Sequence, residues 1–339
     1  MKPKTANLVQ APGAGRPAWF DAFLADRGTR KPSRHTVAAY CADFDAIARI
    51  LVTRRAAESS VHLNEIADEP LGTAFAAYAE KHKAATVRRC WSSWNVLCTY
   101  LLTTGRISKN PMIKVGRPKI EKTLPKSLPA RAIQKLIAEL SVVSVPQNSF
   151  DWPERDRATI LLGLLTGLRT EELIQANVED IRRAEGWAVI EVRGKGRKDR
   201  RVPVEQCLVD VIDGYLESRL SRFPPPTAQR LADAKSYEWP PLTPLLVGID
   251  ANRMTRGTLQ YRVKRAFHLA GIDDDRARGA LVHSLRHTYA TQLAISDVSV
   301  YTLMNLLGHE SMTTSQRYVT AAGSETRRAA ASNPIYGML

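Results

Sequence analysis

The sequence predicts a mainly α-helical protein of two domains, the second of which carries a small antiparallel β-sheet. Its 339 residues exceed the usual size of one domain. Apolar residues recur at helical spacing through most of the chain, and two alternating segments flank one turn rich in glycine and basic residues. With 44% hydrophobic and 24% charged residues, the composition is that of a globular protein with buried cores.

The front of the chain is predicted to be a loose tail followed by a small helical domain. Residues 1–15 are rich in Ala, Pro and Gly, which is typical of a mobile tail. Residues 16–112 show helical periodicity, with predicted helices at 18–28, 33–57, 71–83 and 85–105. Ser33 favours the start of the second helix, and Gly105 favours the end of the fourth.

Residues 113–127 are predicted to be an extended basic linker between the domains. Four prolines lie between residues 110 and 129, and residues 114–126 contain five basic side chains against the single acidic Glu121. A second domain is expected over residues 128–325. Its predicted elements are helices at 130–140 and 154–165, a hairpin of 187–192 and 200–204, and further helices from about Leu208. The proline-rich stretch 223–244 is interpreted as an insertion or loop.

The net charge of +15 indicates a polyanionic partner, with nucleic acid favoured over an acidic membrane. The excess is concentrated in residues 1–127, which hold 21 Lys and Arg against 10 Asp and Glu. The longest apolar stretch, residues 158–168, is too short to span a bilayer, and the N-terminus lacks the apolar core of a signal peptide. We therefore expect a cytoplasmic protein that does not enter membranes.

The sequence gives no sign of a metal or nucleotide cofactor. The four cysteines form no CxxC pair and have no metal-like spacing with histidine, so they are interpreted as reduced thiols. The stretch "RGKGRKD" at 193–199 is similar to a phosphate-binding loop, but its lysine lies on a predicted hairpin rather than before a helix. No acidic cluster indicates a two-metal nuclease. No cofactor is expected.

Two stretches place single basic residues where they can reach a phosphate group. "TGLRTEEL" puts Arg169 after a glycine turn at the start of a helix, where acidic residues are also expected from the helix dipole. "RGKGRKDRRVP" puts Lys195 between two glycines at the hairpin tip, where the backbone can approach a ligand closely.

Two later stretches add histidines and a second arginine. "VHSLRHTYA" places His283 and Arg286 at i and i+3, on one face of a helix. "LLGH" is expected to end a helix at Gly308, which favours a left-handed C-cap, and to present His309 just beyond it. Tyr318 follows nine residues later, and taken alone it would be interpreted as an ordinary half-buried aromatic residue.

These sequence motifs occur in the order R, K, HxxR, LLGH and Y. This order resembles that of the tyrosine recombinase (phage integrase) family. His309 stands 23 positions after Arg286, and Tyr318 stands nine positions after His309. The resemblance covers nearly the whole chain, because "SRHTVAAYCADF" at 33–44 is similar to the first long helix of the family's SAM-like core-binding domain. It implies that residues 16–112 and 128–325 form a C-shaped clamp on DNA.

The resemblance also implies a reaction. Tyr318 is expected to attack a DNA phosphodiester and form a covalent 3′-phosphotyrosine, which needs neither ATP nor Mg²⁺. Arg169 and Arg286 suit the stabilisation of charge on the non-bridging oxygens, because a guanidinium group can bind two oxygens at once. Lys195 suits the acid that protonates the departing 5′ oxygen.

The remaining members of the expected site support this chemistry. His283 and His309 are expected to hydrogen-bond the phosphate or to relay the phenolic proton. Glu172 matches the family's acidic position and is expected to orient His or Arg side chains, whereas Glu171 is expected to be solvated.

Double-stranded DNA with specific recombination sites is the expected partner, and a dimer on one site and a tetramer in the synapse are the expected assemblies. The C-terminal tail, residues 326–339, is expected to contact a neighbouring protomer, although folding onto its own domain is the alternative. Candidate DNA-contacting residues are Arg34, Arg88, Arg89, Lys114, Arg117, Lys119, Arg197, Lys198 and Arg200.

Three functions stay open on sequence alone. A site-specific recombinase that integrates, excises or resolves DNA of a mobile element or phage is favoured. A type IB topoisomerase shares the catalytic residue types, and a DNA-binding regulator could retain a vestigial site. The 114 residues between Arg169 and His283 exceed the spacing expected of compact family members, and the proline-rich stretch 223–244 accounts for the extra length.

Overall fold

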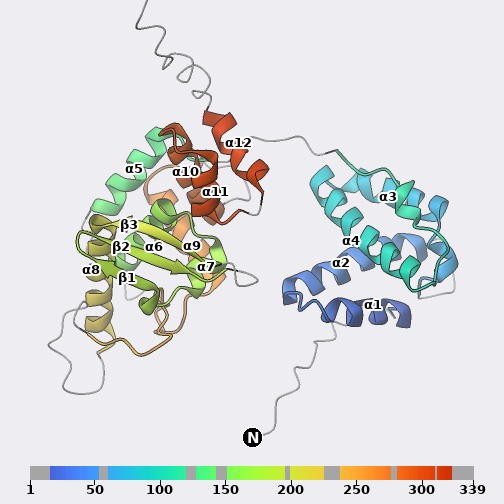
Figure 1. The fold of residues 1–339 in the computed structure, drawn as a ribbon, viewed down its shortest axis with the longest axis horizontal. Helices are drawn as coiled ribbons and strands as arrows, with labels where there is room; N and C mark the ends of the chain where they lie inside the picture. Colours follow the sequence, from blue (N-terminus) through green and yellow to red (C-terminus); the bar gives the residue numbers. More distant parts are fainter. Residues whose placement is uncertain are drawn as a thin grey trace, which may run out of the picture. The chain divides into compact units, whose positions relative to one another are not determined.

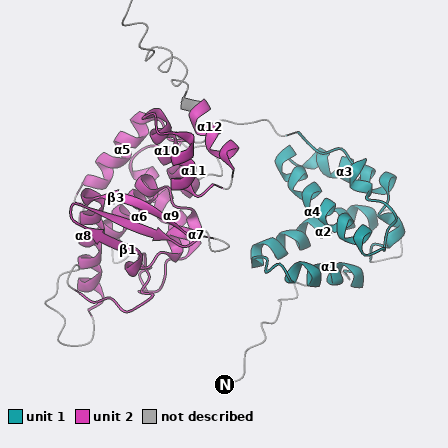
Figure 2. Ribbon diagram, viewed as in Figure 1, with its two compact units in different colours: residues 1–122 teal, residues 123–339 magenta. Residues whose placement is uncertain are grey.

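The computed structural model describes residues 16–52, 60–119, 127–142, 151–194, 199–224, 237–275, 281–309 and 311–322. The chain divides into two compact units, residues 1–122 and 123–339, each with its own hydrophobic core (Figure 2). The division falls within the segment expected to be the linker. The expected tails at 1–15 and 326–339 lie outside the described residues.

The first unit is helical, as the sequence predicts (Figure 1). Its helices are α1 Ala18–Gly28, α2 Arg34–Val52, α3 Asp68–Lys81 and α4 Ala84–Thr103, with single 3-10 turns at Leu63–Glu65 and Pro111–Ile113. The Ser33 hydroxyl accepts a hydrogen bond from the Thr36 N–H at 3.2 Å, which confirms Ser33 as the start signal of α2. Helix α3 begins three residues earlier than predicted, because acidic residues favour its first turn.

Aromatic rings form the centre of the first core. Phe44 of α2 stacks on Phe20 of α1 with ring centroids 4.0 Å apart, and on Trp94 of α4 at 5.5 Å. Cys90 and Cys98 are fully buried beside them, and burial raises the pKa of each thiol to about 12. All four cysteines of the chain are free, as expected, and these two are protonated core residues.

A buried carboxylate joins α2 to α4. Asp43 is 1% exposed and accepts hydrogen bonds from Arg89 Nη1 at 2.8 Å and from the Ser93 hydroxyl at 2.7 Å. Burial raises the pKa of Asp43, and the Ser93 and Arg89 contacts oppose that rise. Arg89, a candidate DNA contact, therefore has an internal partner, although half of its side chain stays exposed.

The beginning of the expected linker packs onto the first unit rather than lying free. Val115 is buried in the first core, and its carbonyl accepts a hydrogen bond from Trp91 Nε1 at 2.9 Å. The Arg117 guanidinium lies 5.2 Å from the Trp91 ring centroid, and Lys114 forms an ion pair with Asp68 at 3.1 Å. Residues 120–126 lie outside the described part of the chain.

The second unit is α-rich with one small antiparallel sheet, which confirms the predicted fold class. Its helices are α5 Ala130–Ser141, α6 Pro153–Thr166, α7 Thr170–Gln175, α8 Gln206–Arg222, α9 Arg256–Leu269, α10 Leu281–Ile295, α11 Val300–Leu307 and α12 Met312–Ala322. Its strands are β1 Ile181–Ala184, β2 Trp187–Val192 and β3 Arg200–Glu205, in the order β1-β2-β3.

The predicted hairpin is present as β2 and β3, and β1 is an addition to it. Ile190 pairs with Ile181 on one side and with Val202 on the other, so that one buried row crosses the sheet. Strand β1 was missed because only its first residue is buried, which leaves no alternation to detect. Gly186, with φ of +77°, allows the tight turn from β1 to β2.

Close packing of α6 against α10 positions the ends of both helices. Gly163 of α6 lies so near α10 that an added β-carbon would be 2.7 Å from Leu285 Cδ1. Helix α6 is buried on most of its surface, and it ends at Gly167 in the left-handed conformation. The turn that follows α6 therefore lies beside the helix that carries His283 and Arg286.

Of the proline-rich insertion, residues 223–224 and 237–244 are described, since residues 225–236 lie outside the described residues. Trp239 packs under the Arg219 guanidinium, which is 4.9 Å from its ring centroid. The Leu245 N–H donates to the Ala176 carbonyl at 2.8 Å, so the end of the insertion is joined to the segment after α7. Among the helices that the structure describes, none is long and apolar enough to cross a membrane.

Replacing Arg89 by Met tests the link between α2 and α4. The substitution leaves the buried Asp43 carboxylate without its cation, and we expect the free energy of unfolding to fall by about 2 kcal/mol. Urea unfolding followed by circular dichroism measures the change. Arg88→Met is the matched control, because Arg88 makes only a long contact of 3.4 Å to the Pro118 carbonyl. Equal stability of the two variants would contradict the structural role of Arg89.

Candidate active site

Arg169 is held at the start of α7 by the turn that ends α6. Gly167 takes φ of +59°, and an added β-carbon there would lie 2.3 Å from Tyr289 Cδ1, so only glycine fits. The Arg169 N–H then donates to Glu172 Oε2 at 2.7 Å. Its guanidinium donates to Glu172 Oε1 at 2.8 Å and to the Gly308 carbonyl at 2.6 Å. Arg169 is thus fixed from two sides while 41% of its side chain stays exposed.

Glu172 is the carboxylate that orients the arginines, as the resemblance implies. Besides Arg169, it accepts two hydrogen bonds from Arg200, at 2.9 and 2.8 Å. Burial alone would raise the pKa of Glu172, but the hydrogen bonds from Arg200 and from the Arg169 N–H outweigh it and lower the pKa to about 2. Glu171 is exposed, and it forms an ion pair with Arg256 rather than being only solvated.

Arg286 reaches the same place from α10. Its side chain is 1% exposed, and it donates to the Gly167 carbonyl at 2.6 Å and to the Leu307 carbonyl at 2.7 Å. Burial, together with the positive charge of Arg169, lowers the pKa of Arg286 to about 10, so it stays protonated at neutral pH. His283 lies one turn earlier with its side chain at the surface. Partial desolvation and the charges of Arg286 and Arg169 lower the pKa of His283.

The C-terminal end of α11 brings these groups together. Gly308 has φ of +61° and caps the helix, which confirms the prediction from "LLGH". His309 follows, and its Nδ1 lies 2.8 Å from the Ser315 hydroxyl of α12. Burial and the charges of Arg286, Arg169 and Arg200 lower the pKa of His309 to about 4. The imidazole is therefore neutral at neutral pH.

Tyr318 lies on α12 beside these groups, but its hydroxyl contacts a residue that the sequence analysis did not select. The ring is 4% exposed and stacks on His309 with centroids 6.2 Å apart. Its hydroxyl lies 2.8 Å from Nδ1 of His287. Burial raises the pKa of Tyr318, and the charge of Arg286 opposes that rise. In the sequence, His287 could have been recognised as a site residue only from its position one turn after His283 on the same predicted helix.

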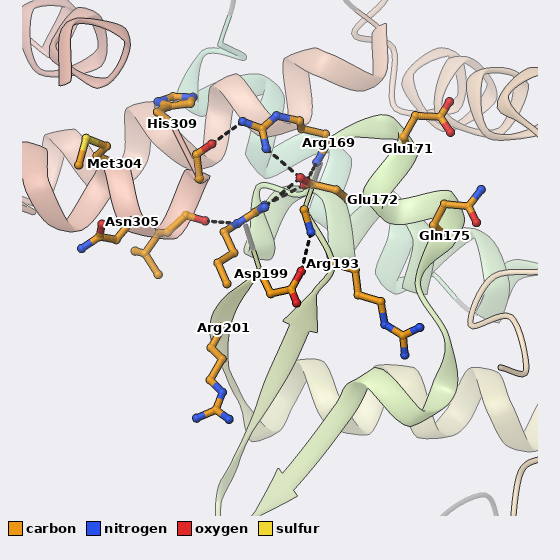
Figure 3. A pocket seen from close by; sticks show the side chains of 14 residues that line it. Arg169, Glu171, Glu172, Gln175, Arg193, Asp199, Arg201, Met304, Asn305 and His309 are labelled. Atoms are coloured by element: carbon orange, nitrogen blue, oxygen red, sulfur yellow. Dashed lines mark hydrogen bonds and ion pairs between the residues drawn. The ribbon is translucent and has the colours of Figure 1, made fainter. Parts of the chain in front are cut away.

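A cavity of about 980 Å³ opens over this cluster (Figure 3). Its lining includes Arg169, Glu172, Arg200, Gly308 and His309. Figure 3 shows Arg169 and Glu172 pointing toward each other at the centre of the view. The hairpin loop that carries Lys195, Arg197 and Lys198 lies outside the described residues, so their place at the cavity stays a prediction. Among the described residues no group of His, Cys, Asp and Glu is arranged to hold a metal ion.

The structure places one candidate DNA contact inside the protein. Arg200 is 9% exposed, and its guanidinium is hydrogen-bonded to Glu172 and to the Leu306 carbonyl. The assignment of Arg200 to a DNA phosphate is therefore corrected to an internal role. By contrast, Arg34, Arg117 and Lys119 have exposed side chains.

Comparison with known proteins supports the same interpretation of fold. A crystal structure of the XerH site-specific recombinase bound to a palindromic difH substrate has a TM-score of 0.68 and 19% identity, and the match covers 93% of this chain and 84% of that one. A lambda integrase (75–356) dimer bound to a COC′ core site has a TM-score of 0.63 and 16% identity, covering 89% and 94%. The fold is that of the tyrosine recombinases.

Relatives in sequence give the family. A tyrosine recombinase XerC of Neisseria meningitidis is 28% identical over 306 residues, which cover 90% of this chain and 91% of that protein. A tyrosine recombinase XerC of Thermodesulfovibrio yellowstonii is 31% identical over 233 residues, covering 69% and 70%. The model of the family described as "Phage integrase family" matches residues 126–325 of this chain. The chain therefore belongs to the phage integrase family and is a tyrosine recombinase.

The lowered pKa of His309 predicts how stability depends on pH. The folded state has a pKa of about 4 at His309, whereas the unfolded chain has the ordinary value of about 6.5. Between these values the unfolded state binds more protons, so acidification favours unfolding and stability rises with pH. We expect the melting temperature of the DNA-free protein to fall as pH is lowered from about 6.5 to about 5.

His309→Gln supplies the comparison, because glutamine can still hydrogen-bond Ser315 but does not titrate. We expect a shallower pH dependence in this variant. Glu172 interferes little, because the stability that its lowered pKa contributes is lost mainly below about pH 4.5, where more than half of the unfolded carboxyl is protonated. If the melting temperatures of the two proteins fell equally steeply with pH across this range, His309 would not be the group responsible.

Proposed function

We propose that this protein cleaves and rejoins DNA strands at specific recombination sites through a covalent 3′-phosphotyrosine formed by Tyr318. The observation that carries the proposal is the meeting of Arg169 and Arg286 on adjacent carbonyls, Gly308 and Leu307. The next residue, His309, stacks on the Tyr318 ring. Two guanidinium groups thus meet at the end of α11, next to the histidine that contacts the phenol. Arg169 and His309 line the cavity, whereas Arg286 and Tyr318 are buried behind its lining.

The chemistry follows from the charges at that point. The Tyr318 oxygen forms a bond to phosphorus while the bond from phosphorus to the 5′ oxygen breaks, and a proton must reach that departing oxygen. Arg169 and Arg286 stabilise the negative charge that grows on the non-bridging oxygens. Lys195 supplies the proton to the 5′ oxygen. Each of these effects is worth orders of magnitude in rate.

The phenol must lose its own proton before or during attack. In the structure the side chain in contact with the Tyr318 hydroxyl is His287, at 2.8 Å, rather than His283 or His309. His287 is therefore the better candidate to accept the phenolic proton, and His309 packs against the ring. Because burial raises the pKa of Tyr318, the phenol is protonated in the DNA-free protein at neutral pH.

Double-stranded DNA is the substrate that fits the charge of the chain. Structures similar to this fold include a lambda integrase dimer bound to a core site and a lambda integrase tetramer bound to a Holliday junction. We propose a dimer on one site and a tetramer when two sites recombine, in the cytoplasm where such DNA is present. The excess charge of the front half supports contact with the DNA backbone.

A supercoiled plasmid with and without paired sites separates this function from its alternatives. Relaxation that does not depend on paired sites would indicate a topoisomerase, and binding without a covalent adduct would indicate a regulator. Products that form only with paired sites are expected here, because the chain belongs to the phage integrase family and its relatives are named tyrosine recombinases.

Tyr318→Phe tests the nucleophile. The change removes one hydroxyl from a ring that otherwise packs in the same way, so we expect DNA binding to persist and covalent adduct on a nicked suicide duplex to vanish. The adduct is measured by its retarded migration in a denaturing gel. An adduct of normal yield in this variant would overturn the proposal.

Lys195→Ala tests the acid separately. Its adduct formation should be slow on ordinary DNA and restored when sulfur replaces the bridging 5′ oxygen, because a thiolate leaves without needing a proton. Sulfur should not rescue Tyr318→Phe, which lacks the nucleophile. It should not rescue Arg169→Ala either, which lacks the guanidinium group that stabilises negative charge on the non-bridging oxygens. If sulfur failed to rescue Lys195→Ala, the role of Lys195 as the acid would be contradicted, and the assignment of Tyr318 as the nucleophile would not be affected.

Salt dependence tests the contact of the front half with the DNA backbone. We expect affinity for a specific duplex to fall steeply with salt, because bound phosphates release counterions. Replacing the exposed Arg34 and Lys119 by Ala should reduce the slope of log K against log salt concentration by up to about 2. A flat dependence in the unaltered protein, measured by fluorescence anisotropy, would contradict DNA backbone binding.

A further inference from the structure

Arg200 makes a set of contacts that a DNA-binding side chain would not make. Its Nε donates to the Leu306 carbonyl at 2.8 Å, Nη1 to Glu172 Oε1 at 2.9 Å and Nη2 to Glu172 Oε2 at 2.8 Å. All three nitrogens therefore have partners within the protein. Arg200 and Glu172 are each 9% exposed, so this is a largely buried, bidentate ion pair.

These contacts join the two parts of the site that hold the phosphate-binding arginines. Glu172 is shared, since it also accepts hydrogen bonds from the guanidinium and the main-chain N–H of Arg169. The Leu306 carbonyl is the first of three successive carbonyls that accept hydrogen bonds from arginines. The Leu307 carbonyl accepts from Arg286, and the Gly308 carbonyl accepts from Arg169. Arg200 thus contacts both the carboxylate and the helix end that position the other two arginines.

We propose that Arg200 is a positioning residue for DNA strand cleavage, which fixes Glu172 and the end of α11 so that Arg169 and Arg286 meet the same phosphate. The inference rests on the proposed function, and it assigns to Arg200 a task that does not involve touching DNA. Nothing but a planar fork with three donors can satisfy Glu172 and the Leu306 carbonyl together, so lysine is a poor substitute.

The neighbouring Gly308 shows how tightly Arg200 is fitted. An added β-carbon at Gly308 would lie 3.1 Å from both Cδ and Nη1 of Arg200. The glycine is therefore required twice, once for its φ of +61° and once for the space that the Arg200 side chain occupies. The helix end and the arginine are packed as one unit.

Arg200 also connects the site to the hairpin. It is the first residue of β3, where it pairs with Val192 at the end of β2. The loop between these strands carries Lys195, whose position is outside the described residues. Arg200 thus ties the start of β3 to α7 and α11.

The test compares Arg200→Met with Arg182→Met, which removes an exposed arginine of the same sheet that pairs only loosely with Glu191, at 3.4 Å. For Arg200→Met we expect adduct formation on a nicked suicide duplex to slow by about 100-fold, because small displacements of reacting groups have effects of this size. DNA affinity should change less than about threefold, and the salt slope should not change. Arg182→Met should match the unaltered protein in rate.

A second substrate distinguishes positioning of the arginines from a loss of folded protein. In a methylphosphonate duplex a methyl group replaces one non-bridging oxygen of the scissile phosphate and removes its negative charge, so cleavage depends less on well-placed guanidinium groups. The ratio of the unaltered rate to the Arg200→Met rate should therefore shrink to less than about tenfold on this duplex, as it should for Arg169→Ala. A fall in the folded fraction would reduce both rates by the same factor.

Arg200→Lys keeps the positive charge, so it keeps the inference testable if Arg200→Met does not fold. We expect it to fold and to cleave at least about tenfold more slowly than the unaltered protein. Normal cleavage by either variant, equal loss on both duplexes, or a salt slope reduced by about 1 would overturn the positioning role. If the unaltered protein formed no adduct, the proposed function would fail instead.

Discussion

Three guanidinium groups converge on three successive carbonyl oxygens at the C-terminal end of α11. Arg200 donates to Leu306, Arg286 to Leu307 and Arg169 to Gly308. The last carbonyls of a helix have no partner within the helix, and they lie at the negative end of its dipole. Side chains from β3, α10 and the start of α7 satisfy them. This one helix end therefore fixes the three guanidinium groups relative to one another.

The same convergence creates the electrostatic character of the site. Among the described residues, four arginines line the cavity, at positions 169, 193, 200 and 201, against three carboxylates, at 171, 172 and 199, so positive charge exceeds negative charge there. Burial, and after it the positive charge of neighbouring arginines, lowers the pKa of His309 and that of Arg286. A phosphodiester, and still more the state with additional negative charge during strand cleavage, provides the missing counter-charge.

The tyrosine is held in place by a different kind of contact from the arginines. It is buried in a small hydrophobic cluster of α10, α11 and α12, with Leu303 and Leu307 among its neighbours. This cluster is separate from the main core of the second unit. The arginines are therefore held by hydrogen bonds to the backbone, whereas Tyr318 is held by apolar packing and a single hydrogen bond to His287.

The sequence by itself determined the features that depend on neighbouring residues. The helices, the β2–β3 hairpin and the left-handed cap at Gly308 follow from periodicity and turn chemistry, and the family was indicated by the resemblance of the motif order. Only the tertiary structure decided that Arg200 pairs with Glu172, 28 residues away, and that His287 contacts Tyr318, 31 residues away. An arginine at a strand end has the same local pattern whether it faces solvent or a buried carboxylate. Its partner is set by the packing of distant segments, which local sequence does not encode.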